Sequence, residues 1–175
     1  MKTKLRSLIE DYMHALNRHG HAFLYRKPPG HYLGYIQENK NPIILIPGIF
    51  EKWQFLKLIA DDLSLKGHPI YVLENLGYNT KGISESAKLI HELIIEKQLT
   101  GTVLIAHSKG GLIGKYLLGF YNKENRIKKL ITVATPFAGS NIVKLLPGKI
   151  FKELSPMHEQ IKSLSNNKTV NHKIV

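Results

Sequence analysis

The sequence predicts an α/β fold in which a mostly parallel sheet carries helices on both faces. Short apolar runs rich in β-branched residues alternate with amphipathic helical stretches, and this alternation is typical of βαβ crossovers. The runs are continuously apolar rather than alternating, as expected for strands that are buried on both faces. The length of 175 residues suits one domain with a sizeable core.

Residues 1–40 are predicted to form a helical extension before an α/β core that spans residues 41–175. Apolar side chains at helical spacing predict an amphipathic helix over residues 3–18; they are Leu5, Leu8, Ile9, Tyr12, Met13 and Leu16. The Pro-Pro-Gly sequence within residues 27–30 predicts a loop. Residues 32–37 are expected to form a short strand.

The core begins with the run Ile43–Ile46, which is predicted to be a buried strand because turn signals bound it. Further strands are expected at residues 69–73, 102–106, 127–133 and 169–175. Helices are expected at residues 52–66, 83–98, 112–120 and about 155–164. Gly67 is a candidate C-cap of the first helix, and Ser155-Pro156 is a candidate N-cap with proline at the first helical position.

Composition and charge exclude several classes of protein. The chain has no cysteine, which excludes disulfides, cysteine-ligated metal centres and a thiol nucleophile. The net charge of +12 comes from scattered lysines, so we interpret it as a solvated basic surface and expect no specific nucleic-acid partner. Acidic residues interrupt the N-terminal apolar stretch, and no run is long enough to span a membrane. A cytoplasmic protein is therefore expected.

The sharpest local motif is Ala106-His107-Ser108-Lys109-Gly110-Gly111, between a predicted strand and a predicted helix. This is the context of a nucleophile elbow, in which a serine occupies a tight and strained strand-to-helix turn. Ala106 and Gly110 are small enough for the strand and helix to approach closely, and His107 is expected to support the turn. Ser108 would stand at the carboxyl edge of the sheet as a nucleophile.

A second motif, Ile46-Pro47-Gly48-Ile49-Phe50, follows the first core strand. Acyl transfer needs two backbone N–H groups aimed at the tetrahedral oxyanion. We expect one from Lys109, which follows the nucleophile, and the other from Ile49 or Phe50 in this turn. No metal-ligand spacing or phosphate-binding loop is present, so neither metal nor cofactor is expected.

With these motifs the sequence resembles the α/β-hydrolase superfamily, and within it the lipase and triacylglycerol-lipase-like serine esterases. The matching segments are residues 43–50, 102–118 and 131–140, and the last contains Ala134-Thr135-Pro136-Phe137-Ala138-Gly139-Ser140. Asn75-Leu76-Gly77-Tyr78-Asn79 is similar to the turn after the second central strand of those enzymes. The resemblance implies hydrolysis of carboxylic (acyl) esters through an acyl-enzyme on Ser108.

The family's chain order is serine, then an acid, then histidine. After Ser108 there is no aspartate; the acids are Glu124, Glu153 and Glu159, and the histidines are His158 and His172. We therefore expect a chain that stops before its triad acid and histidine, with C-terminal strand and helix missing and with weak or no activity. The alternatives are His158 with a nearby glutamate, or His172, as the base, and Glu74 as an acid in an unusual place.

The acyl group is left open among triglyceride, phospholipid, short-chain ester and thioester. Six apolar residues are candidates either for an acyl-binding site or for packing in the core or lid; they are Phe50, Trp53, Phe137, Ile142, Leu145 and Leu146. The alternative function is a non-catalytic α/β module that binds an anionic lipid surface or nucleic acid through its basic charge.

Overall fold

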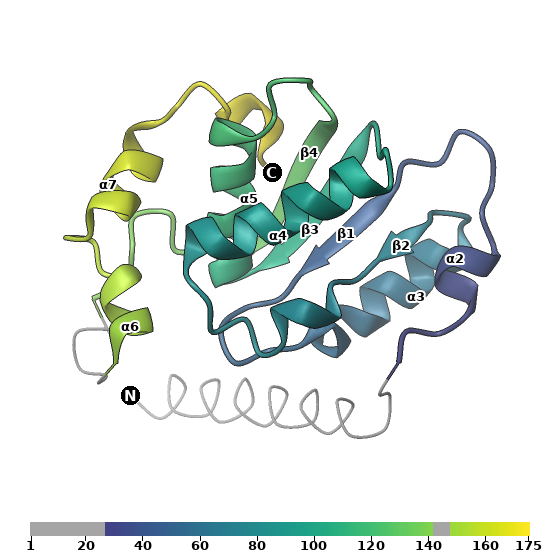
Figure 1. Ribbon diagram of the computed structural model, residues 1–175, viewed down its shortest axis with the longest axis horizontal. Helices are drawn as coiled ribbons and strands as arrows, with labels where there is room; N and C mark the ends of the chain where they lie inside the picture. The colour runs from purple at the N-terminus through teal and green to yellow at the C-terminus, as the bar shows by residue number, and fades with distance from the viewer. Residues whose placement is uncertain (1–26, 142–147) are drawn as a thin grey trace, which may run out of the picture.

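Parallel strands form the centre of the molecule in the computed structural model, which describes residues 27–141 and 148–175 (Figure 1). Within these residues the sheet has four strands in the order β2-β1-β3-β4. Their bounds are β1 Ile43–Ile46, β2 Ile70–Tyr71, β3 Thr102–His107 and β4 Ile127–Val133. The predicted positions of these four strands are confirmed, although β2 is shorter than its apolar run. The predicted helix at residues 3–18 lies outside the described residues.

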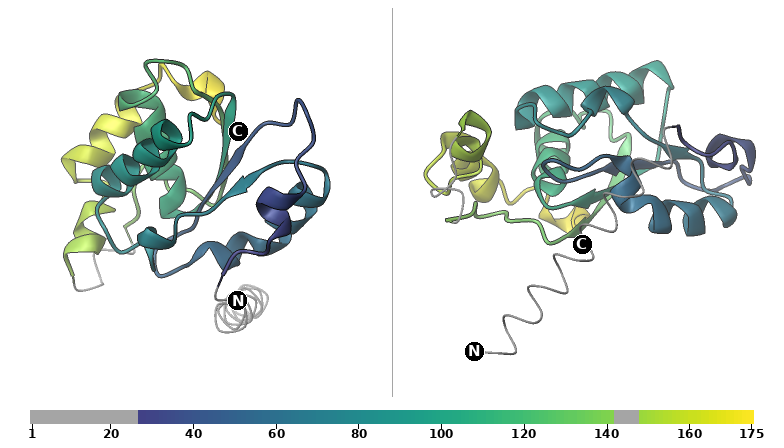
Figure 2. Two further views of the ribbon diagram at one scale, coloured as in Figure 1. Left: turned by 45° about the vertical axis from the view of Figure 1, so that its right-hand side comes forward. Right: turned by 90° about the horizontal axis from the view of Figure 1, so that it is seen from below.

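Helices connect the strands and cover both faces of the sheet, as Figure 2 shows for α3 and α4. The helical elements up to β4 are α2 His31–Gly34, η1 Trp53–Leu56, α3 Lys57–Leu65, η2 Glu74–Leu76, α4 Ile83–Glu96 and α5 Lys109–Phe120. After β4 come α6 Lys149–Glu153, α7 Glu159–Asn166 and η4 Asn171–Lys173. None of the helices in the described ranges is long and apolar enough to cross a membrane.

Alternate side chains of the strands feed two hydrophobic cores. Ile44 and Leu104 point into a core shared with α4 and α5. Ile43 and Leu45 point into the opposite core, where they meet Trp53 of η1 and Ala60 of α3. All four side chains of β1 are buried, which explains why its sequence is continuously apolar rather than alternating.

Residues 32–37, which were expected to form a strand, begin instead within the short helix α2; the strand prediction is wrong. Tyr32 is buried against the edge of the Trp53 ring, with 5.9 Å between ring centroids, and its hydroxyl donates to Asp61 at 3.0 Å. Leu33 and Ile36 are more than half exposed, so the segment has no apolar face of alternating residues to bury in a sheet.

Two C-terminal predictions also need correction. Helix α7 begins at Glu159 with His158 as its N-cap, because the Ser155 carbonyl accepts the His158 N–H in a preceding turn. The expected strand at residues 169–175 is mostly the 3₁₀ turn η4. Only Ile174 forms a parallel bridge, to Leu130, so this end of the chain reaches the outer edge of β4 without forming a full strand.

Candidate functional site

The strand order places the loops after β1 and β3 side by side. From β1 the chain moves to β2 on one side and then crosses back to β3 and β4 on the other. The order therefore reverses between β1 and β3, and ligands of open α/β sheets bind at the carboxyl ends of strands at such a point. Ile46 and Ala106 are paired at the ends of these strands, so the turn after Ile46 adjoins the Ser108 turn.

Ser108 occupies a strained turn between β3 and α5. Its φ of 50° and ψ of −119° lie in a region that residues other than glycine rarely adopt. The turn is held by the Ser108 N–H, which donates to the Val133 carbonyl at 2.9 Å, and by the Gly111 N–H, which donates to the Ser108 carbonyl at 3.0 Å. The half-buried Ser108 therefore stands at the carboxyl edge of the sheet and at the start of a helix.

Small residues permit this close packing. A Cβ on Gly110 would collide with the carbonyl oxygen of Ile46 and would lie 2.9 Å from that of Pro47. A Cβ on Gly111 would collide with the side chain of Thr135. Ala106 is completely buried where β3 meets the helical layer. Helix α5 can therefore start directly beside the end of β1.

The turn after β1 is the second component of the site. Phe50 has a φ of 60°, and the Glu51 N–H donates to the Gly48 carbonyl at 3.3 Å, so the chain reverses sharply here. Lys109 opens α5, and its N–H lies in the first helical turn, where amides lack intrahelical acceptors. The turn that contains Ile49 and Phe50 thus adjoins the turn between Ser108 and Lys109, and the role of these amides as oxyanion donors stays a prediction.

Glu51 joins this turn to the elbow, and no sequence motif identified it. Its buried carboxylate accepts the Gly48 N–H at 2.7 Å and lies 2.9 Å from Nδ1 of His107. The imidazole of His107 stacks on Phe55 with 4.6 Å between ring centroids. The sequence signal for Glu51 is weak, since it is an acid three residues after Gly48 and is followed directly by Lys52.

The side chain of Lys109 holds a third loop, the one after β2. It is completely buried, and its Nζ donates to the carbonyl of Asn79 at 2.9 Å and to that of Lys81. Burial lowers the pKa of Lys109 to about 8, and the nearby charges of Glu153 and Glu85 oppose this shift. Asn79, also buried, donates its amide to the Pro47 carbonyl at 2.6 Å. The loops after β1, β2 and β3 are therefore fastened to one another.

Aromatic side chains lie beside these loops. Phe50 is 47% exposed and contacts Phe151 of α6, with 5.9 Å between ring centroids. Lys52 lies over the ring of the exposed Tyr78, 4.4 Å from its centroid. Two other candidates for the acyl site pack inward: Trp53 belongs to the core below β1, and Phe137 packs against the opposite core. Ile142, Leu145 and Leu146 lie outside the described residues.

The contacts that the structure gives for the acids and histidines considered as triad partners involve groups other than Ser108. Glu153 accepts the Ile83 N–H at 2.9 Å at the start of α4, and Nδ1 of His158 accepts the Gln160 N–H at 3.4 Å. His172 lines a hollow next to Gly101, which precedes β3, and therefore lies at the amino edge of the sheet. Glu74 opens η2 and is exposed. None of these contacts joins an imidazole to Ser108.

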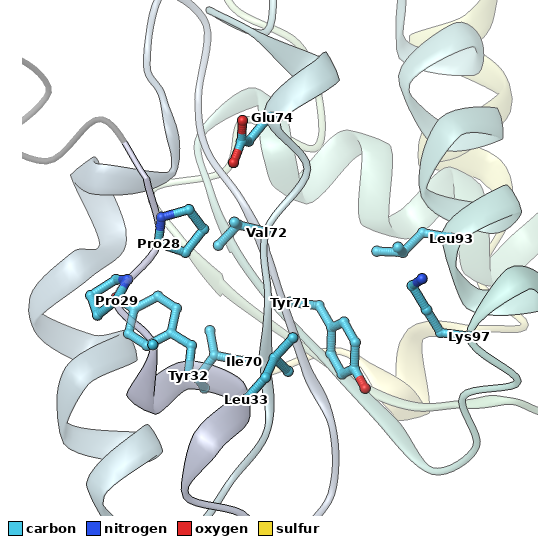
Figure 3. A pocket seen from close by; sticks show the side chains of 11 residues that line it. Pro28, Pro29, Tyr32, Leu33, Ile70, Tyr71, Val72, Glu74, Leu93 and Lys97 are labelled. Carbon is cyan, nitrogen blue, oxygen red and sulfur yellow. The ribbon is translucent and has the colours of Figure 1, made fainter.

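Two concave surfaces lie away from Ser108. An apolar groove of about 350 Å³ follows the outer edge of β2 (Figure 3). In that view Pro28, Pro29 and Tyr32 lie across Val72 from Leu93 and Lys97. The second is a basic hollow of about 500 Å³ at the amino edge of the sheet, lined by Gly101, Asn125, Lys128, Lys129, His172 and Lys173. In the described part of the chain, no three acidic, histidine or cysteine side chains are grouped as metal ligands.

Comparison with known families matches residues 41–156 to the family described as alpha/beta hydrolase fold, which is more than half of the chain. A comparison with curated proteins finds no match. The family match covers β1 to β4, the Ser108 turn and the Gly48 turn.

Solved structures with a similar fold include two of lipase BlEst2 from Bacillus licheniformis. The propeptide form has a TM-score of 0.59 and 17% identity over 81% of this chain and 36% of that one. The mature form has a TM-score of 0.52 and 18% identity over 81% of this chain and 62% of that one. A monoacylglycerol lipase from Paleococcus ferrophilus has a TM-score of 0.50 and 20% identity over 61% of this chain and 46% of that one. The chain thus spans less than two thirds of each of these structures.

Proposed function

This chain belongs to the α/β-hydrolase fold family, and from that premise we propose that it carries the nucleophilic centre of a serine hydrolase of carboxylic esters. The observation that supports this most is the left-handed backbone of Ser108, directly after β3 and beside the turn that follows β1. A serine that only caps an ordinary helix does not require such backbone strain. The lipase structures with a similar fold agree with an ester substrate.

In the proposed reaction, Ser108 Oγ attacks the acyl carbonyl and forms a C–O bond while its proton passes to a base. The N–H groups of Lys109 and of Ile49 or Phe50 stabilise the negative charge on the carbonyl oxygen. The C–O bond to the alcohol then breaks, the alcohol takes a proton, and water hydrolyses the acyl-enzyme. Every residue named here lies in the turn after β1 or at the junction of β3 with α5.

The base that accepts the Ser108 proton governs the expected rate. Each histidine in residues 27–141 and 148–175 has a different neighbour: Ser64 for His31, the Asn41 carbonyl for His68, Tyr121 for His91, Glu51 for His107, Gln160 for His158, and the basic hollow for His172. Loss of a triad histidine lowers rates by several powers of ten. We therefore propose weak turnover for this chain alone.

Labelling with a serine-directed fluorophosphonate tests the nucleophile. We expect slow labelling at Ser108, located by peptide mapping and abolished in Ser108→Ala, with weak hydrolysis of p-nitrophenyl butyrate. Absence of labelling in a folded protein would contradict the proposed nucleophile. Rapid ester turnover that Ser108→Ala abolishes would instead support the nucleophile and contradict the proposed weakness.

The basic hollow at the amino edge of the sheet favours a second candidate function, a module that binds an anionic lipid surface. Lys128, Lys129 and Lys173 line this hollow, and no aspartate or glutamate is among its lining residues in the described part of the chain. We expect Lys128→Glu with Lys129→Glu to weaken salt-dependent binding to phosphatidylserine vesicles. Binding of DNA but not vesicles would contradict the lipid partner. The cytoplasmic location expected from the sequence stays a prediction.

A further inference from the structure

Glu51 is a buried carboxylate that bridges two loops of the proposed site. One loop follows β1 and the other follows β3, and the pairing of Ile46 with Ala106 places the two side by side. The same carboxylate oxygen lies 2.7 Å from the Gly48 nitrogen and 2.9 Å from Nδ1 of His107. A carboxylate buried to this extent is costly unless it is hydrogen-bonded, and both donors meet that need.

The fit of the carboxylate against Gly48 depends on the missing side chain of that residue. A Cβ on Gly48 would lie 2.8 Å from Oε2 of Glu51 and 3.0 Å from its Cδ. A side chain at position 48 would therefore displace the Glu51 carboxylate from its present place, so glycine permits this close approach. The carboxylate in turn fixes the direction of the Gly48 N–H.

The contact with His107 fixes an imidazole on the elbow. Because an ionised carboxylate only accepts hydrogen bonds, His107 donates from Nδ1 to Glu51. Stacking on Phe55 holds the plane of the ring. His107 directly precedes Ser108, so the carboxylate links the backbone of the nucleophile turn to that of the Gly48 turn.

We propose that Glu51 is a positioning residue for ester hydrolysis, and that it acts by holding the turn of residues 48–50 in register with Ser108. This inference rests on the proposed function. An oxyanion donor must lie at hydrogen-bond distance from the developing charge, and a displacement of about 1 Å can cost about a hundredfold in rate. Because the Gly48 N–H donates to Glu51, the amides proposed to stabilise the oxyanion are the next ones, of Ile49 or Phe50.

The test combines an NMR measurement that is independent of activity with the labelling rate at Ser108. The variants are Glu51→Ala, Glu51→Gln, His107→Leu and His107→Asn, and the control is Glu92→Ala, whose carboxylate is exposed on α4. In the wild type we expect a downfield Gly48 amide proton, which should move upfield in Glu51→Ala but not in Glu92→Ala. The His107→Asn variant keeps a side-chain donor near the position of Nδ1, whereas the His107→Leu variant has none.

We expect the fluorophosphonate labelling rate to fall about 10- to 100-fold in Glu51→Ala and to fall less in Glu51→Gln. His107→Leu should also be slow, and His107→Asn should recover part of the rate; these two carry the test if Glu51→Ala does not fold. Labelling of Glu51→Ala or His107→Leu at the wild-type rate would overturn the positioning role. An unchanged Gly48 amide in Glu51→Ala would overturn the contact itself. An unlabelled wild type with the expected Gly48 shift would mean that the proposed function fails while the contact stands.

Discussion

At the scale of single residues, Gly110 controls how closely the Ser108 turn approaches β1. A Cβ at this position would meet backbone oxygen atoms of Ile46 and Pro47, which cannot move aside like a flexible side chain. We expect Gly110→Ala to lower the free energy of unfolding by about 3 kcal/mol through overpacking, measured by urea denaturation. Gly34→Ala is the control, because nothing lies within 4 Å of its Cβ; it should be neutral or stabilising. Equal effects of the two substitutions would contradict the close approach.

Lys109 makes the stability depend on pH. Burial lowers its pKa in the folded protein from 10.5 to about 8, whereas in the unfolded chain the pKa returns toward 10.5. Between these values the unfolded chain binds more protons, so the free energy of unfolding rises with pH. At about 1.4 kcal/mol per pKa unit, the rise across the window is about 3 kcal/mol.

Denaturation of wild type and Lys109→Met at several pH values measures this effect. The wild type should gain stability relative to Lys109→Met as the pH rises from about 8 to 10.5, and a constant difference would contradict the lowered pKa. Lys88→Met, at an exposed position on α4, is the control for the loss of one lysine.

At the scale of secondary-structure elements, Glu153 ties α6 to the start of α4. Its carboxylate accepts the Ile83 N–H, one of the amides that a helix N-terminus leaves without an intrahelical partner. We expect Glu153→Ala to cost about 1 kcal/mol and to speed hydrogen exchange at the Ile83 amide. Glu124→Ala, which removes an exposed partner of Arg126, should leave that amide unchanged. Slow exchange retained in Glu153→Ala would show that another group caps α4.

The elements that could be predicted from sequence are those whose burial is set by local pattern. The runs at Ile43–Ile46 and Ile127–Val133 form strands with the predicted bounds. Turn residues flank both runs, and Ile43–Ile46 is apolar throughout because both of its faces are buried. Residues 32–37 were misassigned because the burial of Tyr32 depends on Trp53 and Asp61, which lie far along the chain. The last residues pair with β4 at one position only, a tertiary contact that no local pattern specifies.

The same division applies to the candidate site. Ser108 and Gly110 could be singled out because they belong to one local motif, although the backbone atoms that Gly110 contacts belong to Ile46 and Pro47 of a different strand and loop. Glu51 could not, because its partner His107 is 56 residues away. The side chain of Lys109 was also missed, since a lysine is ordinarily expected to be exposed and this one is buried beneath a loop that follows a different strand.

At the scale of the whole molecule, the two cores share the central strand β1. Ile44 is completely buried between β1 and the α4–α5 layer, so Ile44→Ala should lower the free energy of unfolding by about 3 kcal/mol. Leu58→Ala is the control, because Leu58 is 64% exposed and should cost little. Denaturant unfolding followed by circular dichroism measures both. A loss near zero for Ile44→Ala would contradict the position of β1 at the centre of the sheet.

Trp53 is the single tryptophan of the chain, and it lies in the core on the α3 side of the sheet. Its indole is 5% exposed and meets the ring of Tyr32, so its fluorescence should be blue-shifted in the native protein and move to longer wavelength on unfolding. Because η1 follows directly after the Gly48 turn, this emission reports on the segment beside Ser108 without an added dye. The protein thus contains its own optical probe for ligands or substitutions that disturb this side of the site.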